Sequence, residues 1–169
     1  WENVNLPHDF IVGGEVNEDN NIALGFFNYG VAWYIKRFII PSEDSNKRIT
    51  LYFEGIATQS EVYLNGCILH RSQTGYVPFE VDITDMIKIG DNTLTLRVSD
   101  VTEKEDFTRG KQLLKRGGIF YTAQSGIWQS VWYEWVPQQY ISALKITPDY
   151  DNASVSLSIT LNVPHHNGT

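Results

Sequence analysis

The sequence predicts an all-β fold, a β-sandwich, and three observations support that prediction. First, about eight short stretches before residue 137 are rich in β-branched and aromatic residues and alternate apolar with polar side chains, as strands do. Second, turn signals separate them, among them Asn65-Gly66, a dipeptide typical of hairpin turns. Third, no stretch shows the apolar spacing of a helix of ordinary length. Many short strands joined by turns are typical of a sandwich.

The elements of the first half follow in order. Residues 6–10 are expected to be extended, because proline disfavours helix at the residue before it, and residues 13–21 form a polar surface loop. Residues 31–40, VAWYIKRFII, are a strong strand that Pro41 closes. The alternation then predicts further strands at residues 48–55, 61–65, 67–70 and 75–84, with the Asn65-Gly66 turn between the second and third of them.

In the second half, residues 82–89 could include one helical turn, residues 90–92 read as a turn, and residues 93–98 as a strand. Residues 100–117 are charged and aperiodic, and so long a loop inside a compact domain is usually functional. Strands are also predicted at residues 127–136, 140–147 and 153–163. Because residues 127–136 carry bulky side chains on both faces, we expect them to lie centrally in a sheet covered on both sides.

A composition shift near Pro137 predicts a domain boundary. Residues 1–137 supply enough strands for one sandwich, whereas the two strands in residues 138–169 have no further partners within the chain. We therefore expect residues 138–169 to be the first strands of a second, truncated β domain.

Composition excludes several classes of function. The chain has 169 residues, a net charge of −7 and no run of Lys or Arg, so nucleic acid is not an expected partner. No apolar run reaches membrane-spanning length. The one cysteine, Cys67, can form neither an internal disulfide nor a zinc site by itself, and the histidines are not grouped as metal ligands. No metal and no cofactor are expected.

Catalytic residues are not apparent either. Most acidic residues lie in predicted turns and loops, where charge is usually solvated, and Glu54 and Glu61 stand on strands without a local partner. No Gly-x-Ser-x-Gly motif marks a nucleophile. Sugar binding fits better, since aromatic faces and side chains that bond hydroxyl groups hold sugars. The 100–126 loop offers both kinds of side chain in Asp100, Arg109, Lys111, Gln112, Arg116, Tyr121 and Gln124.

Several motifs recur here in the order known from one enzyme family. They are Trp1 with VNLPHD at residues 4–9, GVAWY at 30–34, FEG at 53–55, VYLNG at 62–66, GYVPF at 75–79, VDIT at 81–84, GDN at 90–92 and SGIW at 125–128. Together they cover roughly residues 1–137, and the chain resembles the N-terminal sugar-binding domain of glycoside hydrolase family 2, with most likeness to its β-galactosidase-type members.

The resemblance implies a galactose-binding-like jelly-roll sandwich, then an immunoglobulin-like domain beginning near Tyr140, then a (β/α)₈ barrel. In the family both catalytic glutamates of the retaining mechanism lie in that barrel. The chain alone is therefore expected to be a non-catalytic domain that supports and partly walls the barrel's active site. Its partners would be a β-glycoside bound by the parent enzyme, the parent's other domains and a second subunit of a homo-oligomer, in a periplasmic or secreted protein, with the cytoplasm left open.

In several relatives the loop before Ser-Gly-Ile sends an acidic residue into the barrel's sugar pocket, and here Phe120 or Tyr121 stands in that place. Four residues are accordingly expected to face the barrel or the sugar: Asp9, Arg109, Lys111 and Tyr121. Two alternatives stay open, an independent carbohydrate-binding module and a purely structural domain between domains or subunits. Five residues are expected to hold turns and caps of the fold: Asn65, Gly66, Asp82, Thr84 and Gly126.

Overall fold

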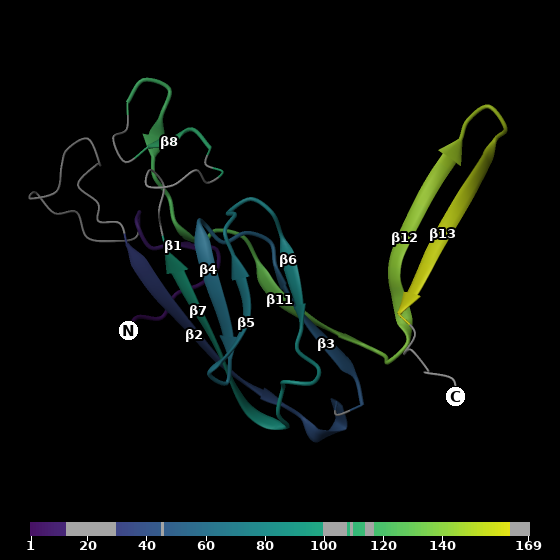
Figure 1. Ribbon diagram of the computed structural model, residues 1–169, viewed down its shortest axis with the longest axis horizontal. Coiled ribbons are helices and arrows are strands. Elements are labelled where there is room, and N and C mark those ends of the chain that lie inside the picture. Colours follow the sequence, from purple (N-terminus) through teal and green to yellow (C-terminus); the bar gives the residue numbers. More distant parts are fainter. Residues whose placement is uncertain (13–29, 45, 100–107, 109, 114–116, 163–169) are drawn as a thin grey trace, which may run out of the picture.

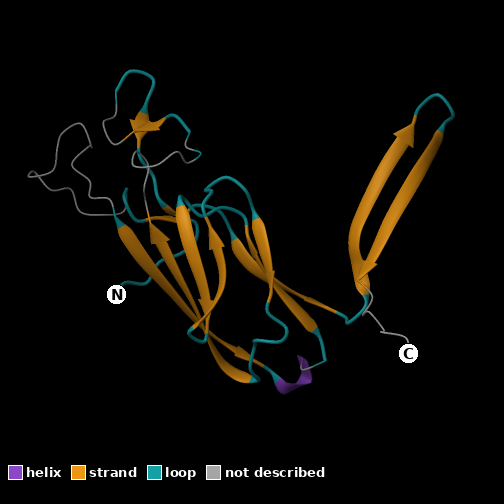
Figure 2. Cartoon of the chain, in the orientation of Figure 1, coloured by secondary structure: helices purple, strands orange, loops and turns teal. Residues whose placement is uncertain are grey.

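The computed structural model describes residues 1–12, 30–44, 46–99, 108, 110–113 and 117–162 (Figure 1). Strands make up nearly all of its regular structure, and the short 3₁₀-helix η2 (Ser42–Asp44) is the helical element seen in the described part (Figure 2). No helix among these residues is both long and apolar enough to cross a membrane.

Two antiparallel sheets form a sandwich. The four-stranded sheet has the order β2 (Val31–Ile40), β7 (Gly90–Ser99), β4 (Gln59–Leu64), β5 (Cys67–Ser72). The three-stranded sheet has the order β11 (Val131–Val136), β3 (Arg48–Phe53), β6 (Phe79–Asp82). The all-β jelly-roll sandwich expected from the sequence is confirmed.

The core lies between these sheets, where alternate side chains of each strand point inward. In β7, Leu94, Leu96 and Val98 are buried while Thr95 and Arg97 between them are only half-buried. The complete buried apolar cluster is Ile40, Ile49, Leu51, Phe53, Ile56, Val62, Leu64, Ile83, Leu94, Leu96, Val98 and Ile127. The alternation of apolar and polar residues in the sequence therefore corresponds to the alternation of buried and more exposed side chains in the strands.

The hairpin between β4 and β5 has the predicted turn. Asn65 and Gly66 both have positive φ, 52° and 85°, the combination that a two-residue hairpin turn requires. Residues 90–92, expected as a turn, instead begin β7, because Gly90 pairs with Ile40 at the end of β2. Asn92 is only 2% exposed, and its side chain forms hydrogen bonds with the backbone of Lys88 and Gly90. These backbone groups, around the start of β7, therefore have hydrogen-bond partners.

The prediction that residues 127–136 form a central strand is wrong. Strand β11 begins at Val131 and is an edge strand that pairs with β3. Trp132 is 42% and Tyr133 is 50% exposed. Large side chains on its outer face suggested a second covering layer, but Trp132 stacks on Tyr52 of the neighbouring strand instead.

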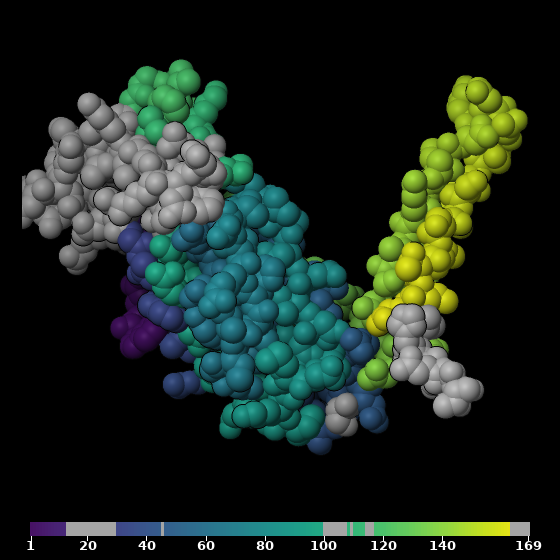
Figure 3. Space-filling view, viewed as in Figure 1, coloured from purple at the N-terminus to yellow at the C-terminus, as the bar shows by residue number. Residues whose placement is uncertain are grey.

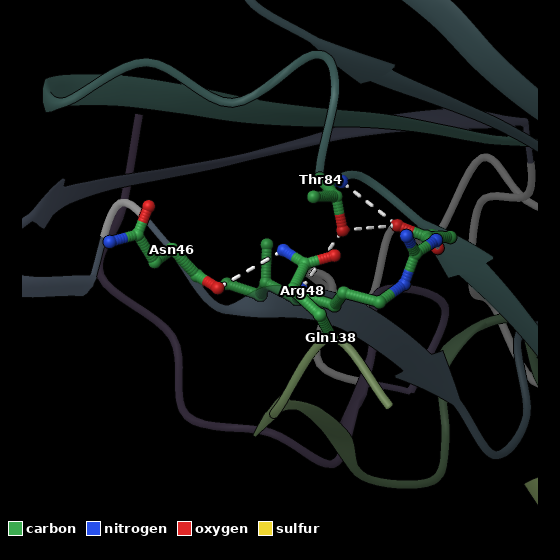
Figure 4. Close-up of polar contacts among 6 residues, drawn as sticks. Asn46, Arg48, Thr84 and Gln138 are labelled. Carbon is green, nitrogen blue, oxygen red and sulfur yellow. Dashed lines mark hydrogen bonds and ion pairs between the residues drawn. The ribbon is translucent and has the colours of Figure 1, made fainter. Parts of the chain in front are cut away.

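A polar cluster stabilises the region where β3 begins (Figure 4). Arg48 pairs with Asp82, whose Oδ1 also accepts from the Thr84 backbone at 2.9 Å and from Thr84 Oγ1 at 2.5 Å. Desolvation opposes ionisation of Asp82, but the hydrogen bonds from Thr84 and Arg48 outweigh it and lower its pKa. Gln138 Nε2 donates to the Asn46 carbonyl at 3.0 Å, which fastens the segment after Pro137 to the sandwich.

Beyond that segment, β12 (Tyr140–Asp149) and β13 (Ser154–Asn162) form a two-stranded hairpin that stands apart from the sandwich (Figure 1, Figure 3). Register places its apolar residues opposite one another, for example Leu144 with Ile159 and Ile146 with Leu157, each more than half exposed. The domain boundary at residue 137, and an immunoglobulin-like identity for residues 138–169, stay predictions.

Candidate functional site

At one end of the sandwich, residues Ser125 and Gly126 join three segments of the chain. Strand β10 (Gly126–Ile127) pairs with β1 (His8–Asp9), and the Phe10 backbone N–H donates to the Ser125 carbonyl at 2.9 Å. Gly126 exchanges backbone hydrogen bonds of 3.0 and 3.2 Å with Ala57. The Ser125 hydroxyl, 1% exposed, donates to the Ala57 carbonyl at 2.6 Å. These bonds hold residues 8–10, Ala57 and residues 125–127 together.

Gly126 is required at this junction. Its φ is +148°, and a Cβ at this position would lie 2.2 Å from the His8 carbonyl oxygen and 3.0 Å from Tyr34 Oη. The backbones of β1 and β10 can approach so closely only because there is no side chain. The expectation that Gly126 holds the fold agrees with this geometry.

Asp9, a predicted sugar- or barrel-facing residue, lies at the same junction. Its Oδ1 accepts from the backbone N–H groups of Ile11 at 2.8 Å, Val12 at 3.1 Å and Ser125 at 3.4 Å. The carboxylate thus orders residues 9–12 and ties them to the Ser125 loop. A direct contact between Asp9 and a sugar stays a prediction.

Lys111 and Tyr121, two further predicted residues, come together. Strand β8 (Gln112–Leu113) pairs in parallel with β9 (Tyr121–Thr122), and the Tyr121 N–H donates to the Lys111 carbonyl at 2.7 Å. They line an open hollow of about 550 Å³ with Gln112, Thr122 and Gln124. The Tyr121 side chain is 70% exposed. Arg109, the fourth predicted residue, lies outside the described residues.

Two aromatic residues that the sequence analysis did not place at the site hold this loop. Tyr76 Oη accepts from the Gly110 N–H at 2.9 Å and from Gln112 Nε2 at 3.4 Å. The ring centroids of Tyr76 and Trp128 are 5.7 Å apart. Trp128 Nε1 donates a hydrogen bond of 2.9 Å to the Gly75 carbonyl. The motifs GYVPF and SGIW contain both residues and were the signal that could have identified the pair.

A larger hollow of about 950 Å³ lies between the edge strands β2 and β11, beside residues 1–6. His8 Nδ1 is 2.9 Å from Tyr34 Oη within its lining. Burial raises the pKa of Tyr34 to about 12, to which the negative charges of Asp9 and Glu2 contribute. At neutral pH this phenol therefore stays protonated and acts as a hydrogen-bonding group.

The two hollows differ from a glycosidase centre. Retaining glycosidases place two carboxyl groups about 5–5.5 Å apart across the scissile bond. Among the residues that the structure describes, the smaller hollow is lined by no carboxylate, and the larger has Glu2 as its one acidic residue. Within the described part of the chain no group of three or more His, Cys, Asp and Glu residues could hold a metal ion.

The two glutamates that the sequence placed on strands have hydrogen-bond partners, none of which is a second carboxylate. Glu61 accepts from Tyr63 Oη at 2.7 Å and from Arg71 Nε at 3.1 Å, and both bonds lower its pKa. Glu54 accepts from Trp132 Nε1 at 3.1 Å. The missed signal for Glu61 is cross-strand register, because Arg71 on β5 lies directly opposite it.

Comparison with known proteins gives a consistent result. The family described as "Glycosyl hydrolase 2 galactose-binding domain-like" matches residues 8–129. A beta-glucuronidase of Formosa agariphila is 27% identical over 159 residues, which are 90% of this chain and 15% of that protein. Another protein of that organism is 35% identical over 147 residues, 87% of this chain and 16% of its own length.

A beta-galactosidase and the structure of a beta-glycosidase are also similar to this chain. A beta-galactosidase of Thermoanaerobacter pseudethanolicus is 32% identical over 136 residues, 79% of this chain and 18% of its own. The crystal structure of a beta-glycosidase from Bacteroides vulgatus superposes with a TM-score of 0.71 at 27% identity, over 96% of this chain and 20% of that one. The chain thus spans less than a quarter of the length of each of these relatives.

Proposed function

The chain belongs to glycosyl hydrolase family 2, as its galactose-binding domain-like N-terminal domain, and from this we propose that it is a non-catalytic domain that supports and partly walls the active site of a catalytic barrel. The parent would be a β-galactosidase-like enzyme that hydrolyses O-glycosidic bonds with retention. A periplasmic or secreted location belongs to the same proposal.

The observation that carries the proposal is the hollow formed by Lys111 and Tyr121. In the described part of the chain, its lining offers an ammonium group, two amides, a threonine and an aromatic ring, but no carboxylate. Such groups orient a sugar and cannot supply the acid and nucleophile that hydrolysis needs. The loop is nevertheless tied to the sandwich, since Gln112 Oε1 accepts from the Gln124 N–H at 3.0 Å and Tyr76 accepts from Gly110. Side chains that are held at Gly110 and Gln112 in this way, and that can bond the hydroxyl groups of a sugar, are suited to act as a wall.

The β12–β13 hairpin favours a second role for the chain, as the connection from the sandwich to a further domain. Seven of its apolar side chains are 54–59% exposed: Ile141, Leu144, Ile146, Val155, Leu157, Ile159 and Leu161. An apolar sheet face of this kind is normally covered by another layer. This agrees with residues 138–169 opening a further domain that links the sandwich to the barrel.

The wall is tested by kinetics of the full-length enzyme that carries this chain. Because Tyr121 would contact bound substrate and not the reacting atoms, Tyr121→Ala is expected to raise KM about tenfold with little change in kcat. Tyr150→Ala is the matched control, since Tyr150 is 96% exposed on the hairpin turn. If Tyr121→Ala and Tyr150→Ala give the same KM, the wall proposal fails.

A further inference from the structure

The outer face of the three-stranded sheet carries an exposed aromatic and acidic cluster, here termed the Trp132 patch. It consists of Tyr52, Glu54, Glu80, Trp132 and Glu134. Trp132 and Tyr52 lie directly opposite each other on β11 and β3, and Glu80 on β6 lies opposite Tyr52. The patch belongs to neither of the hollows described above.

The two rings leave one face of the indole uncovered. Their centroids are 4.0 Å apart and their planes differ by 11°, so the rings are stacked face to face along the direction that joins the strands. Since β11 is the edge strand of this sheet, the second face of Trp132 looks away from β3 and over the sheet edge. The 42% exposure of Trp132 agrees with this arrangement.

Hydrogen bonds fix the rings and place acceptor oxygens at their rim. Trp132 Nε1 donates to Glu54 Oε1 at 3.1 Å, and Tyr52 Oη donates to Glu134 Oε2 at 3.3 Å. The second oxygen of each of these two carboxylates takes part in no hydrogen bond within the described residues. A pyranose has this complementary form, with an apolar C–H face and hydroxyl donors around it.

The charge of the patch selects among sugars. Glu54, Glu80 and Glu134 have no ion-pair partner within the described part of the chain, whereas the neighbouring Asp82 is paired with Arg48. Desolvation, and then the charges of Glu80 and Glu134, raise the pKa of Tyr52. The negative potential that this reflects opposes the binding of a uronate or a sulfated sugar.

We propose that the Trp132 patch is a binding site for a neutral oligosaccharide, with one sugar ring stacked on the free face of Trp132 and its hydroxyl groups donating to Glu54 and Glu134. The site would hold a part of a glycan distant from the bond being cleaved. It requires only the sandwich, so it can be tested on the 169-residue chain and does not depend on the wall formed by Tyr121.

The experiment titrates sugars into the chain. Binding is measured by calorimetry and by changes in the indole N–H resonances of the NMR spectrum. Cellotetraose and β-1,4-galactotetraose are the neutral sugars, tetragalacturonate the acidic one and hexalysine the basic peptide. We expect at least one neutral sugar to bind saturably with a millimolar Kd and to shift the Trp132 indole signal. Tetragalacturonate should not bind.

Variants assign the binding to the patch. Trp132→Ala is expected to weaken neutral-sugar binding at least tenfold, and Trp132→Leu, which retains bulk but no ring, should do the same if Trp132→Ala folds poorly. Tyr150→Ala should leave the affinity unchanged. Absence of neutral-sugar binding, or binding lost in Tyr121→Ala and retained in the Trp132 variants, would overturn the proposal. So would preferential binding of hexalysine or of tetragalacturonate at the patch.

Discussion

Gly126 is the position at which the structure makes its sharpest prediction about stability. A Cβ in Gly126→Ala would lie 2.2 Å from the His8 carbonyl oxygen, about 1 Å inside an ordinary contact. Strain of this kind at a positive φ costs about 1–3 kcal/mol. Displacing Gly126 away from His8 would also weaken its two backbone hydrogen bonds with Ala57, at about 1 kcal/mol each. The expected loss is about 3–5 kcal/mol.

Urea unfolding monitored by tryptophan fluorescence measures this loss. The free energy of unfolding falls by about 2 kcal/mol per molar urea, so the urea midpoint of unfolding of Gly126→Ala should fall by roughly 1.5–2.5 M. Gly66→Ala is the control, because Gly66 also has positive φ, +85°, but nothing lies within 4 Å of its added Cβ. Its loss should be about 1–2 kcal/mol. A loss in Gly126→Ala no larger than in Gly66→Ala would refute the close-approach argument.

Substitutions at three more positions test the polar contacts. Asp9→Ala should lower the free energy of unfolding by about 1–2 kcal/mol because Ile11 and its neighbours lose their acceptor, and Asp9→Asn, which retains an oxygen, should lose less than half of that; urea unfolding checks both. Asn92→Ala should cost about 2–3 kcal/mol in the same assay, since the part-buried backbone groups of Lys88 and Gly90 lose the side chain that bonds them. The pKa of Asp82 is lowered in the folded protein, so its contribution to stability is complete above the unfolded pKa and is lost as pH falls through the folded pKa. Asp82→Asn should therefore flatten the acid side of the plot of stability against pH, and an unchanged plot would contradict the stabilisation of the Asp82 carboxylate by Thr84 and Arg48.

The long strands were predictable because burial follows alternation. Strand β2 has the bounds expected from its β-branched and aromatic run, and the Asn65-Gly66 turn requires a conformation that few other dipeptides adopt. The place of β11 within its sheet was not predictable. Bulky residues on both faces fit a covered central strand and also an edge strand that stacks its outer rings on a neighbour, and only strand order distinguishes the two.

The candidate site was predictable in part. The aromatic and polar composition of the loop identified Lys111 and Tyr121, which the structure brings together around one hollow. The short strands that position them are two residues long, too short to show any period. Tyr76 lies 34 residues before Gly110 along the chain, and its hydroxyl contact with that residue follows from tertiary packing alone.

The central claim, that this chain is a non-catalytic domain, is tested most directly by assaying the purified chain on p-nitrophenyl β-galactoside and p-nitrophenyl β-glucuronide. Since the described residues place no pair of carboxylates in either hollow, we predict no release of nitrophenol above that of buffer. Hydrolysis that co-elutes with the folded chain through repeated purification would contradict the claim and would locate a catalytic centre within these 169 residues.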